Sequence, residues 1–263
     1  MESKNPVFSR SPYTHQQQQG WTPSPEHLQG MYDNPAYAPP TAPATRTMTI
    51  DDVVVRGFMT LGTLVVAGAA SWYFEVGMGV AVVSALIGVV LGLIASFKQS
   101  TSPPLILGYA LFYGVFVGAL SRMYESFFNG IVLQAVIGTA LAFAAVLTVY
   151  SLRIVRVTPK FTKFVVAAAI GALALVLVNL IAGFFVDGGL GLRTDSPLGW
   201  IFSAAMILLG TFFLLLDFDE IERGVKAGAP EKFAWQCAFG LTLSLVWIYL
   251  EVLRFISYFS GDD

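Results

Sequence analysis

The sequence predicts an all-α polytopic membrane protein with seven transmembrane helices. Apolar residues make up 56% of the 263 residues, charged residues only 12%, and the mean hydropathy is +0.69. Soluble domains carry about 25% charged residues, so this chain has too little charge to cover a water-facing surface. Beyond residue 47 the apolar residues form seven runs, each near the roughly 20 residues that cross a bilayer as a helix. Runs such as 131–150 are apolar at both odd and even positions, which excludes the alternating strands of a membrane barrel.

Residues that start or stop helices separate the seven runs. Prolines 103 and 104 open the third run, Pro159 lies in the connection after the fourth, an Asp-Gly-Gly sequence at 187–189 follows the fifth, and Pro230 precedes the seventh. The expected spans are 53–74, 79–97, 103–121, 131–151, 164–186, 199–218 and 236–259.

Residues 1–47 differ in composition from the rest of the chain. They hold eight of the 13 prolines and a run of glutamines at 16–19, and they contain no apolar run of helical length. Such a segment cannot bury enough apolar surface to offset its ordering entropy. We therefore expect a disordered cytoplasmic tail over residues 1–47 and a transmembrane domain over residues 48–263.

The distribution of lysine and arginine predicts the orientation in the membrane. With seven spans, 12 of the 15 cations fall on the side of the N-terminus. Only Arg122 and Arg193 fall on the opposite side, and Arg254 lies inside the last span. Because cytoplasmic loops carry the excess of Lys and Arg, we expect the N-terminus in the cytoplasm and the C-terminus outside.

Cysteine and histidine are too few for the common metal and catalytic sites. Cys237 is the single cysteine, and both histidines lie within the first 30 residues. No zinc site or histidine-based triad can be assembled in the hydrophobic part, and no HExxH motif occurs. The net charge of −2 gives no basic excess to attract nucleic acid. We therefore expect no enzyme activity, no cofactor and no nucleic-acid partner.

The acids at the end of the sixth span are the first candidate functional residues. A charge at membrane depth costs about 2.5–3.5 kcal/mol, so its presence needs an explanation. Asp217 is flanked by Leu216 and Phe218, which makes it the acid that we expect within the bundle. Asp219 is a supporting candidate on a different face of the helix. The alternative interpretation is a solvated acidic helix end.

Glu251 in the last span has two interpretations. It precedes Arg254 by three residues, the spacing of a neutralised pair on one helix. Alternatively, Glu251 points into the bundle and meets Asp217. Two carboxylates in one low-dielectric site cannot both ionise cheaply, so one would hold a proton. Such a pair would act as a proton-controlled latch or would coordinate a cation such as calcium.

At these two stretches the sequence resembles the Bax inhibitor family, also called the transmembrane Bax inhibitor motif family, and its bacterial YccA-like members. The stretch 215–218, Leu-Leu-Asp-Phe, is similar to the family's Leu-Tyr-Asp motif. The stretch 248–254, which contains Glu251 and Arg254, is similar to its Leu-Tyr-Leu-Asp-Phe motif with a following Leu-Arg. Residues 118–125 and 160–161 resemble an actinobacterial-type branch, and the whole resemblance covers about residues 50–259.

The resemblance implies a bundle with a central last helix and a pH-sensitive calcium leak channel, here in a bacterial plasma membrane. The carboxylate pair that opens and closes the path in bacterial relatives would be Asp217 and Glu251, with Arg254 and Asp219 as supporting residues. Glutamate replaces the usual second aspartate. Raising the pH would deprotonate the pair and open the path. The alternative function is a non-conducting modulator that binds a membrane protease or another membrane protein, as some relatives are described to do.

Overall fold

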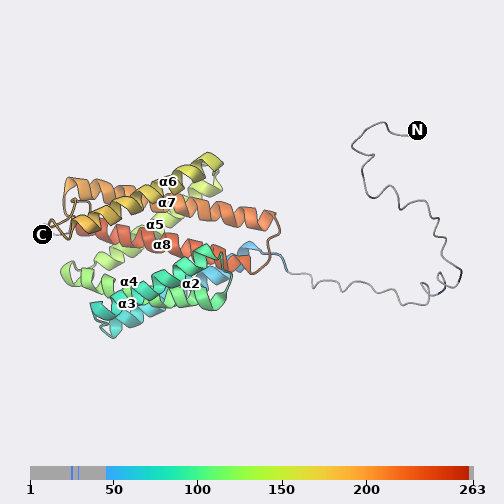
Figure 1. The fold of residues 1–263 in the computed structure, drawn as a ribbon, viewed down its shortest axis with the longest axis horizontal. Helices are drawn as coiled ribbons and strands as arrows, with labels where there is room; N and C mark the ends of the chain where they lie inside the picture. The colour runs from blue at the N-terminus through green and yellow to red at the C-terminus, as the bar shows by residue number, and fades with distance from the viewer. Residues whose placement is uncertain (1–24, 26–28, 30–45, 261–263) are drawn as a thin grey trace, which may run out of the picture. The chain divides into compact units, whose positions relative to one another are not determined.

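The structure, a computed structural model, describes residues 46–260 together with Pro25 and Gln29. Within residues 46–260 it contains seven helices that are long and apolar enough to cross a membrane, and no strand (Figure 1). They are α2 (Ile50–Tyr73), α3 (Met78–Phe97), α4 (Pro103–Phe127), α5 (Ile131–Ser151), α6 (Pro159–Ala182), α7 (Pro197–Lys226) and α8 (Phe233–Ser257). The predicted all-α polytopic fold is confirmed. The expected tail lies outside the described residues, except for Arg46, Thr47 and the two isolated positions.

Two helices continue past the C-terminal ends of their expected spans because polar residues continue them. α7 runs to Lys226 rather than ending at 218, and ion pairs of Asp219 with Arg223 and of Glu222 with Lys226 join successive turns of this extension. α4 likewise runs to 127 rather than 121.

α6 begins at Pro159 rather than 164 and ends at 182 rather than 186. Proline at a first helical position lacks only an N–H that would have no partner within the helix. The Thr158 hydroxyl caps the helix by accepting a hydrogen bond from the amide of Phe161.

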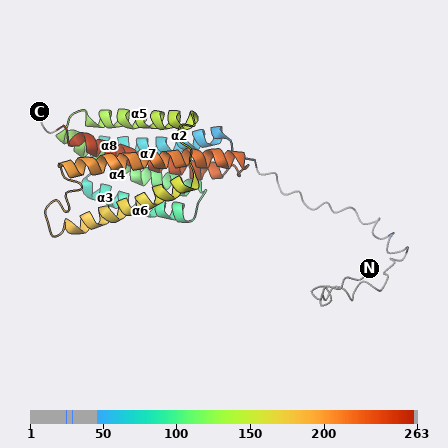
Figure 2. The ribbon, with the colours of Figure 1, turned by 90° about the horizontal axis from the view of Figure 1, so that it is seen from above.

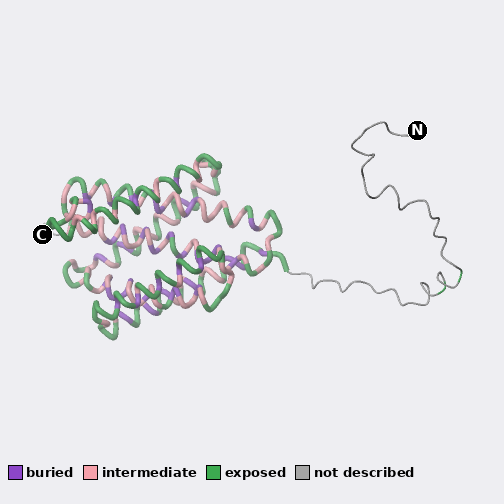
Figure 3. Tube along the Cα trace, viewed as in Figure 1, coloured by how far each residue is buried: buried purple, intermediate pink, exposed green. Residues whose placement is uncertain are grey.

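The last helix lies at the centre of the bundle. α8 packs against α2, α4, α5 and α7, whereas α3 packs mainly on α4 and α6 mainly on α7 (Figure 2). Ile248 and Leu253 of α8 are completely buried. The outer helices expose large apolar side chains, among them Leu86 of α3 and Ile170 of α6, so the outer surface of the bundle is suited to lipid (Figure 3). The expected central position of the last helix is confirmed.

Glycines allow the backbones of α2 and α4 to approach each other. A Cβ atom on Gly118 would lie 2.1 Å from the carbonyl oxygen of Gly68, and one on Gly114 would lie 2.4 Å from the carbonyl oxygen of Leu64. No side chain fits at these distances. Close packing through small residues is a main source of helix association in lipid, where the hydrophobic effect does not draw helices together.

The segment just before α2 is hydrogen-bonded to the α7–α8 connection. The amide of Met48 donates to the carbonyl of Ala229, and the amide of Glu231 donates to the carbonyl of Arg46. The side chain of Met48 is 2% exposed and packs near Gly224 and Phe233. The N-terminal end of the membrane domain is therefore held against the hairpin formed by the last two helices.

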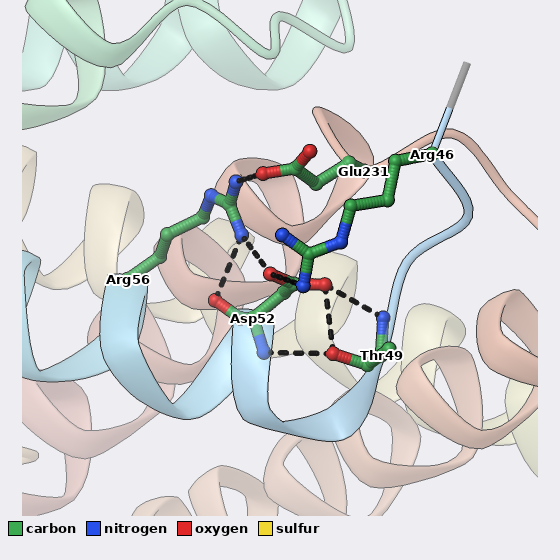
Figure 4. A network of polar contacts seen from close by, with 5 residues as sticks. All are labelled: Arg46, Thr49, Asp52, Arg56 and Glu231. Atoms are coloured by element: carbon green, nitrogen blue, oxygen red, sulfur yellow. Dashed lines mark hydrogen bonds and ion pairs between the residues drawn. The ribbon is translucent and has the colours of Figure 1, made fainter. Parts of the chain in front are cut away.

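Side chains reinforce this attachment at the start of α2 (Figure 4). Thr49 and Asp52 form a capping box, in which each side chain accepts a hydrogen bond from the backbone amide of the other residue. Arg56 pairs with Asp52 on its own helix and with Glu231 of the α7–α8 connection. Arg46 adds a second cation to Asp52.

Candidate functional site

Asp217 lies where α7 faces α8. The Ser244 hydroxyl of α8 donates a hydrogen bond to the Asp217 carboxylate. Gly240, one turn earlier on α8, leaves room for that carboxylate, because a Cβ atom there would lie 2.8 Å from Asp217 Oδ1. None of the ion pairs among the described residues includes Asp217. Asp217 can therefore gain or lose a proton without breaking an ion pair of the described part.

Apolar residues next to Asp217 hold this turn of α7 within the bundle. Leu214 and Leu215 are buried, and the Phe218 ring packs against the rings of Phe143 and Tyr150 on α5. The expectation that Asp217 lies inside the bundle, rather than at a solvated helix end, agrees with this packing.

Glu251 lies in a cluster with two arginines. Its Oε1 atom is 3.0 Å from Arg254 Nη1 and 3.4 Å from Arg193 Nη2, and its side chain is 8% exposed. The Ser203 hydroxyl of α7 donates a 3.3 Å hydrogen bond to the other carboxylate oxygen. The intrahelical pair of Glu251 with Arg254, one of the two interpretations of the sequence, is thus present.

The predicted contact between Asp217 and Glu251 is wrong, and with it the calcium site that the two acids would share. By helical rise, Ser244 and Glu251 lie about 10 Å apart along α8, and Ser203 and Asp217 lie about 21 Å apart along α7. Because the two helices are antiparallel, each acid faces a serine of the opposite helix at a different depth. We call the end of the bundle at which α2 begins the N side and the other end the C side. Asp217 lies nearer the N side, and Glu251 lies nearer the C side.

Asp219, the other supporting candidate, follows Asp217 by two residues but has a different partner. It pairs with Arg223 one turn further along α7, in the polar extension of that helix. Asp219 therefore contributes to the end of α7 rather than to the interface with α8.

Sequence reasoning missed three residues of these two clusters: Ser244, Ser203 and Arg193. A signal for Ser244 was present, because it precedes Glu251 by two helical turns and both therefore lie on one face of α8. Arg193 belongs to the irregular connection between α6 and α7, where helical periodicity gives no indication of direction.

The chain matches the Bax inhibitor 1 like family over residues 5–261. No curated protein matches it. The predicted resemblance to the Bax inhibitor family is confirmed, and the assignment to an actinobacterial-type branch stays a prediction. Since the match extends over all seven helices and both acid clusters, the chain belongs to the Bax inhibitor 1 like family.

Proposed function

We propose that the protein is a pH-sensitive cation leak channel in which Asp217 is the proton-sensing group. The observation that carries the proposal is a carboxyl group between two transmembrane helices, held by a serine hydroxyl and included in none of the ion pairs of the described residues. Ionisable residues within membrane spans are costly and are typical of ion or proton pathways. Membership of the Bax inhibitor 1 like family supports the same function.

The neutral form of Asp217 suits a closed bundle. A protonated carboxyl group can keep its hydrogen bond with Ser244 and can lie against Gly240 without bringing a charge into the apolar interface. At low pH the interface between α7 and α8 therefore stays closely packed, and the path is closed.

Deprotonation of Asp217 favours a looser bundle. An ionised carboxylate in an apolar environment is stable only with water or a cation beside it. Glu220 lies one turn further along α7 and adds a second negative charge near the same end of the helix. Raising the pH therefore favours separation of α7 from α8 and entry of water and cations. Calcium is the proposed cation because it prefers carboxylate and other oxygen ligands.

Glu251 has a separate role in this proposal. Its ion pair with Arg193 joins the C-side end of α8 to the α6–α7 connection, and the hydrogen bond from Ser203 joins it to α7. We place Asp217 in the cytoplasmic half and Glu251 in the outer half of a bacterial plasma membrane, because 10 of the 13 lysines and arginines in residues 46–260 fall on the N side.

Calcium flux into liposomes that contain the purified full-length protein tests the proposal. We expect flux to be low at acidic pH and to rise as the pH is raised, relative to liposomes without protein. If the protein reconstitutes in folded form but gives no flux at any pH, the leak function is wrong. The non-conducting modulator of a membrane protease or another membrane protein would then be the better account.

A further inference from the structure

A groove of about 490 Å³ runs along one flank of the bundle. α3 and α4 form one wall, α6 and α7 the other, and α8 the floor. Its lining is largely apolar and includes Leu93 of α3, Phe116 of α4, Leu173 of α6 and Trp247 of α8. Leu93 and Leu173 are both exposed, so the groove opens sideways onto the surface that faces the membrane.

The groove is elongated along the bundle. Its lining on α4 extends from Tyr109 to Tyr124, about 22 Å by helical rise, and its lining on α8 extends from Leu243 to Arg254, about 16 Å. A hydrocarbon core is about 30 Å thick, so a groove of about 22 Å is longer than one leaflet and shorter than the whole core. This shape suits an acyl chain that lies along the membrane normal.

The C-side end of the groove is positively charged. Arg193, Arg254 and Glu251 all line it, which gives two cations against one anion. The arginine side chains are 30% and 22% exposed, so a ligand in the groove can reach both. Nε of Arg193 is buried and has no hydrogen-bond partner among the described residues. The polar end therefore carries one positive charge more than Glu251 can neutralise, and it has an N–H donor without an acceptor among the described residues.

The positive charge of Arg193 is only partly stabilised by the residues around it. Burial, and then the positive charge of nearby Arg254, lower the pKa of Arg193. An anion beside the two guanidinium groups would offset both effects, because charge-assisted hydrogen bonds from arginine to phosphate are strong and often bidentate.

We propose that the groove binds an anionic phospholipid of the surrounding membrane. The phosphate lies against Arg193 and Arg254, and an acyl chain lies along the apolar walls. The net positive charge at the polar end favours an anionic headgroup over a zwitterionic one, whose ammonium group would face two arginines. The sideways opening makes membrane lipid, rather than a water-soluble anion, the occupant. This site does not depend on whether the protein conducts ions.

Native mass spectrometry of the full-length protein tests lipid binding. The delipidated protein is titrated with phosphatidylglycerol or with phosphatidylcholine. We expect one phosphatidylglycerol to bind about tenfold more tightly than phosphatidylcholine, which corresponds to one charge-assisted contact. Arg193→Gln should remove most of this preference, and Arg193→Lys should retain it. Arg122→Gln is the matched control, because Arg122 lies at the same side of the bundle but pairs with Glu75 outside the groove.

A second pair of variants tests the apolar part. Leu173→Trp should fill the groove and weaken binding of both lipids, whereas Leu175→Trp should not, because Leu175 is exposed on the same helix but does not line the groove. Both sites are exposed, so neither change should prevent folding. The proposal is wrong if the protein binds the two lipids with equal affinity. It is also wrong if the two tryptophan variants weaken binding equally, or if Arg122→Gln loses the lipid preference as much as Arg193→Gln does. Displacement of the lipid by an equal concentration of glycerol phosphate would also overturn it, because the site would then bind a free anion.

Discussion

Ser244 of α8 donates a hydrogen bond to Asp217 of α7, and this contact replaces the carboxylate pair expected from the sequence. The acid at the end of the sixth span thus has a neutral partner, whereas the acid of the last span has two cationic partners. The two acids consequently respond differently to substitution and to pH.

Removing the hydroxyl should shift the pH response of flux. In Ser244→Ala the ionised Asp217 loses a hydrogen-bond donor, so ionisation requires a higher pH. We expect the midpoint of calcium flux against pH to rise by about one unit, since a hydrogen bond to a charged group contributes about 1.5 kcal/mol or more. Ser257→Ala is the control, because its hydroxyl donates to a carbonyl of its own helix. A midpoint that stays unchanged or moves to lower pH would contradict this role of Ser244.

Removing the charge of Glu251 should destabilise the protein. Glu251→Gln leaves Arg193 and Arg254 close together without their shared anion, and removing one partner of a buried ion pair typically costs about 3–5 kcal/mol. Since the arginines are partly exposed, we expect the lower end of that range. Thermal unfolding in detergent measures it. Arg122→Gln breaks the more exposed pair with Glu75 and should cost less than about 1 kcal/mol. Equal stability losses in the two variants would count against the cluster.

Asp217 and Glu251 should behave as independent sites. Ser244, the partner of Asp217, lies about 10 Å from Glu251 along α8, and Ser203, a partner of Glu251, lies about 21 Å from Asp217 along α7. Mutational effects on unfolding free energy usually add at such separations. We expect the double variant Asp217→Asn with Glu251→Gln to lose the sum of the two single changes, within about 0.5 kcal/mol. A larger coupling would mean that the two acids form one unit.

A methyl group at Gly118 should disturb the contact between α2 and α4. Its Cβ would lie 2.1 Å from the carbonyl oxygen of Gly68, so the backbones must separate. We expect Gly118→Ala to cost about 1–3 kcal/mol in unfolding free energy. Gly57→Ala in α2 is the control, because its added Cβ would meet no atom within 4 Å apart from its chain neighbours and the backbone of its own helix. This control should keep or slightly raise the melting temperature, since alanine favours helix.

The attachment before α2 should matter for stability, whereas the preceding residues should not. Met48→Ala removes a side chain buried against the α7–α8 hairpin and should cost about 2 kcal/mol or more. Ile50→Ala, at an exposed position two residues later, should cost far less.

Removal of residues 1–45 leaves this attachment in place, so the melting temperature should not change. A large loss of stability on that truncation would show that the removed residues support the membrane domain.

Hydropathy predicted the number of helices because each span needs a long apolar segment. It did not predict the full length of α7, whose last two turns are polar and are joined by the pairs of Asp219 and Glu222 with following cations. Flanking leucine and phenylalanine residues were enough to place Asp217 inside the bundle. The sequence indicates that Ser244 and Glu251 share a face of α8, but it does not show which of the two contacts Asp217, because the register of α7 against α8 depends on the end of α7 and on the connection that follows. This register places Ser244, rather than Glu251, opposite Asp217.

The measurement that tests the central claim most directly is calcium flux against pH for Asp217→Asn in proteoliposomes. Asparagine keeps the shape and hydrogen bonding of the protonated acid but cannot ionise. We therefore expect low flux at every pH, equal to that of the unmodified protein at acidic pH. Asp219→Asn and Glu222→Gln remove acids from the same helix and should keep the rise of flux with pH. If Asp217→Asn retains that rise while one of these controls loses it, Asp217 is not the proton-sensing group.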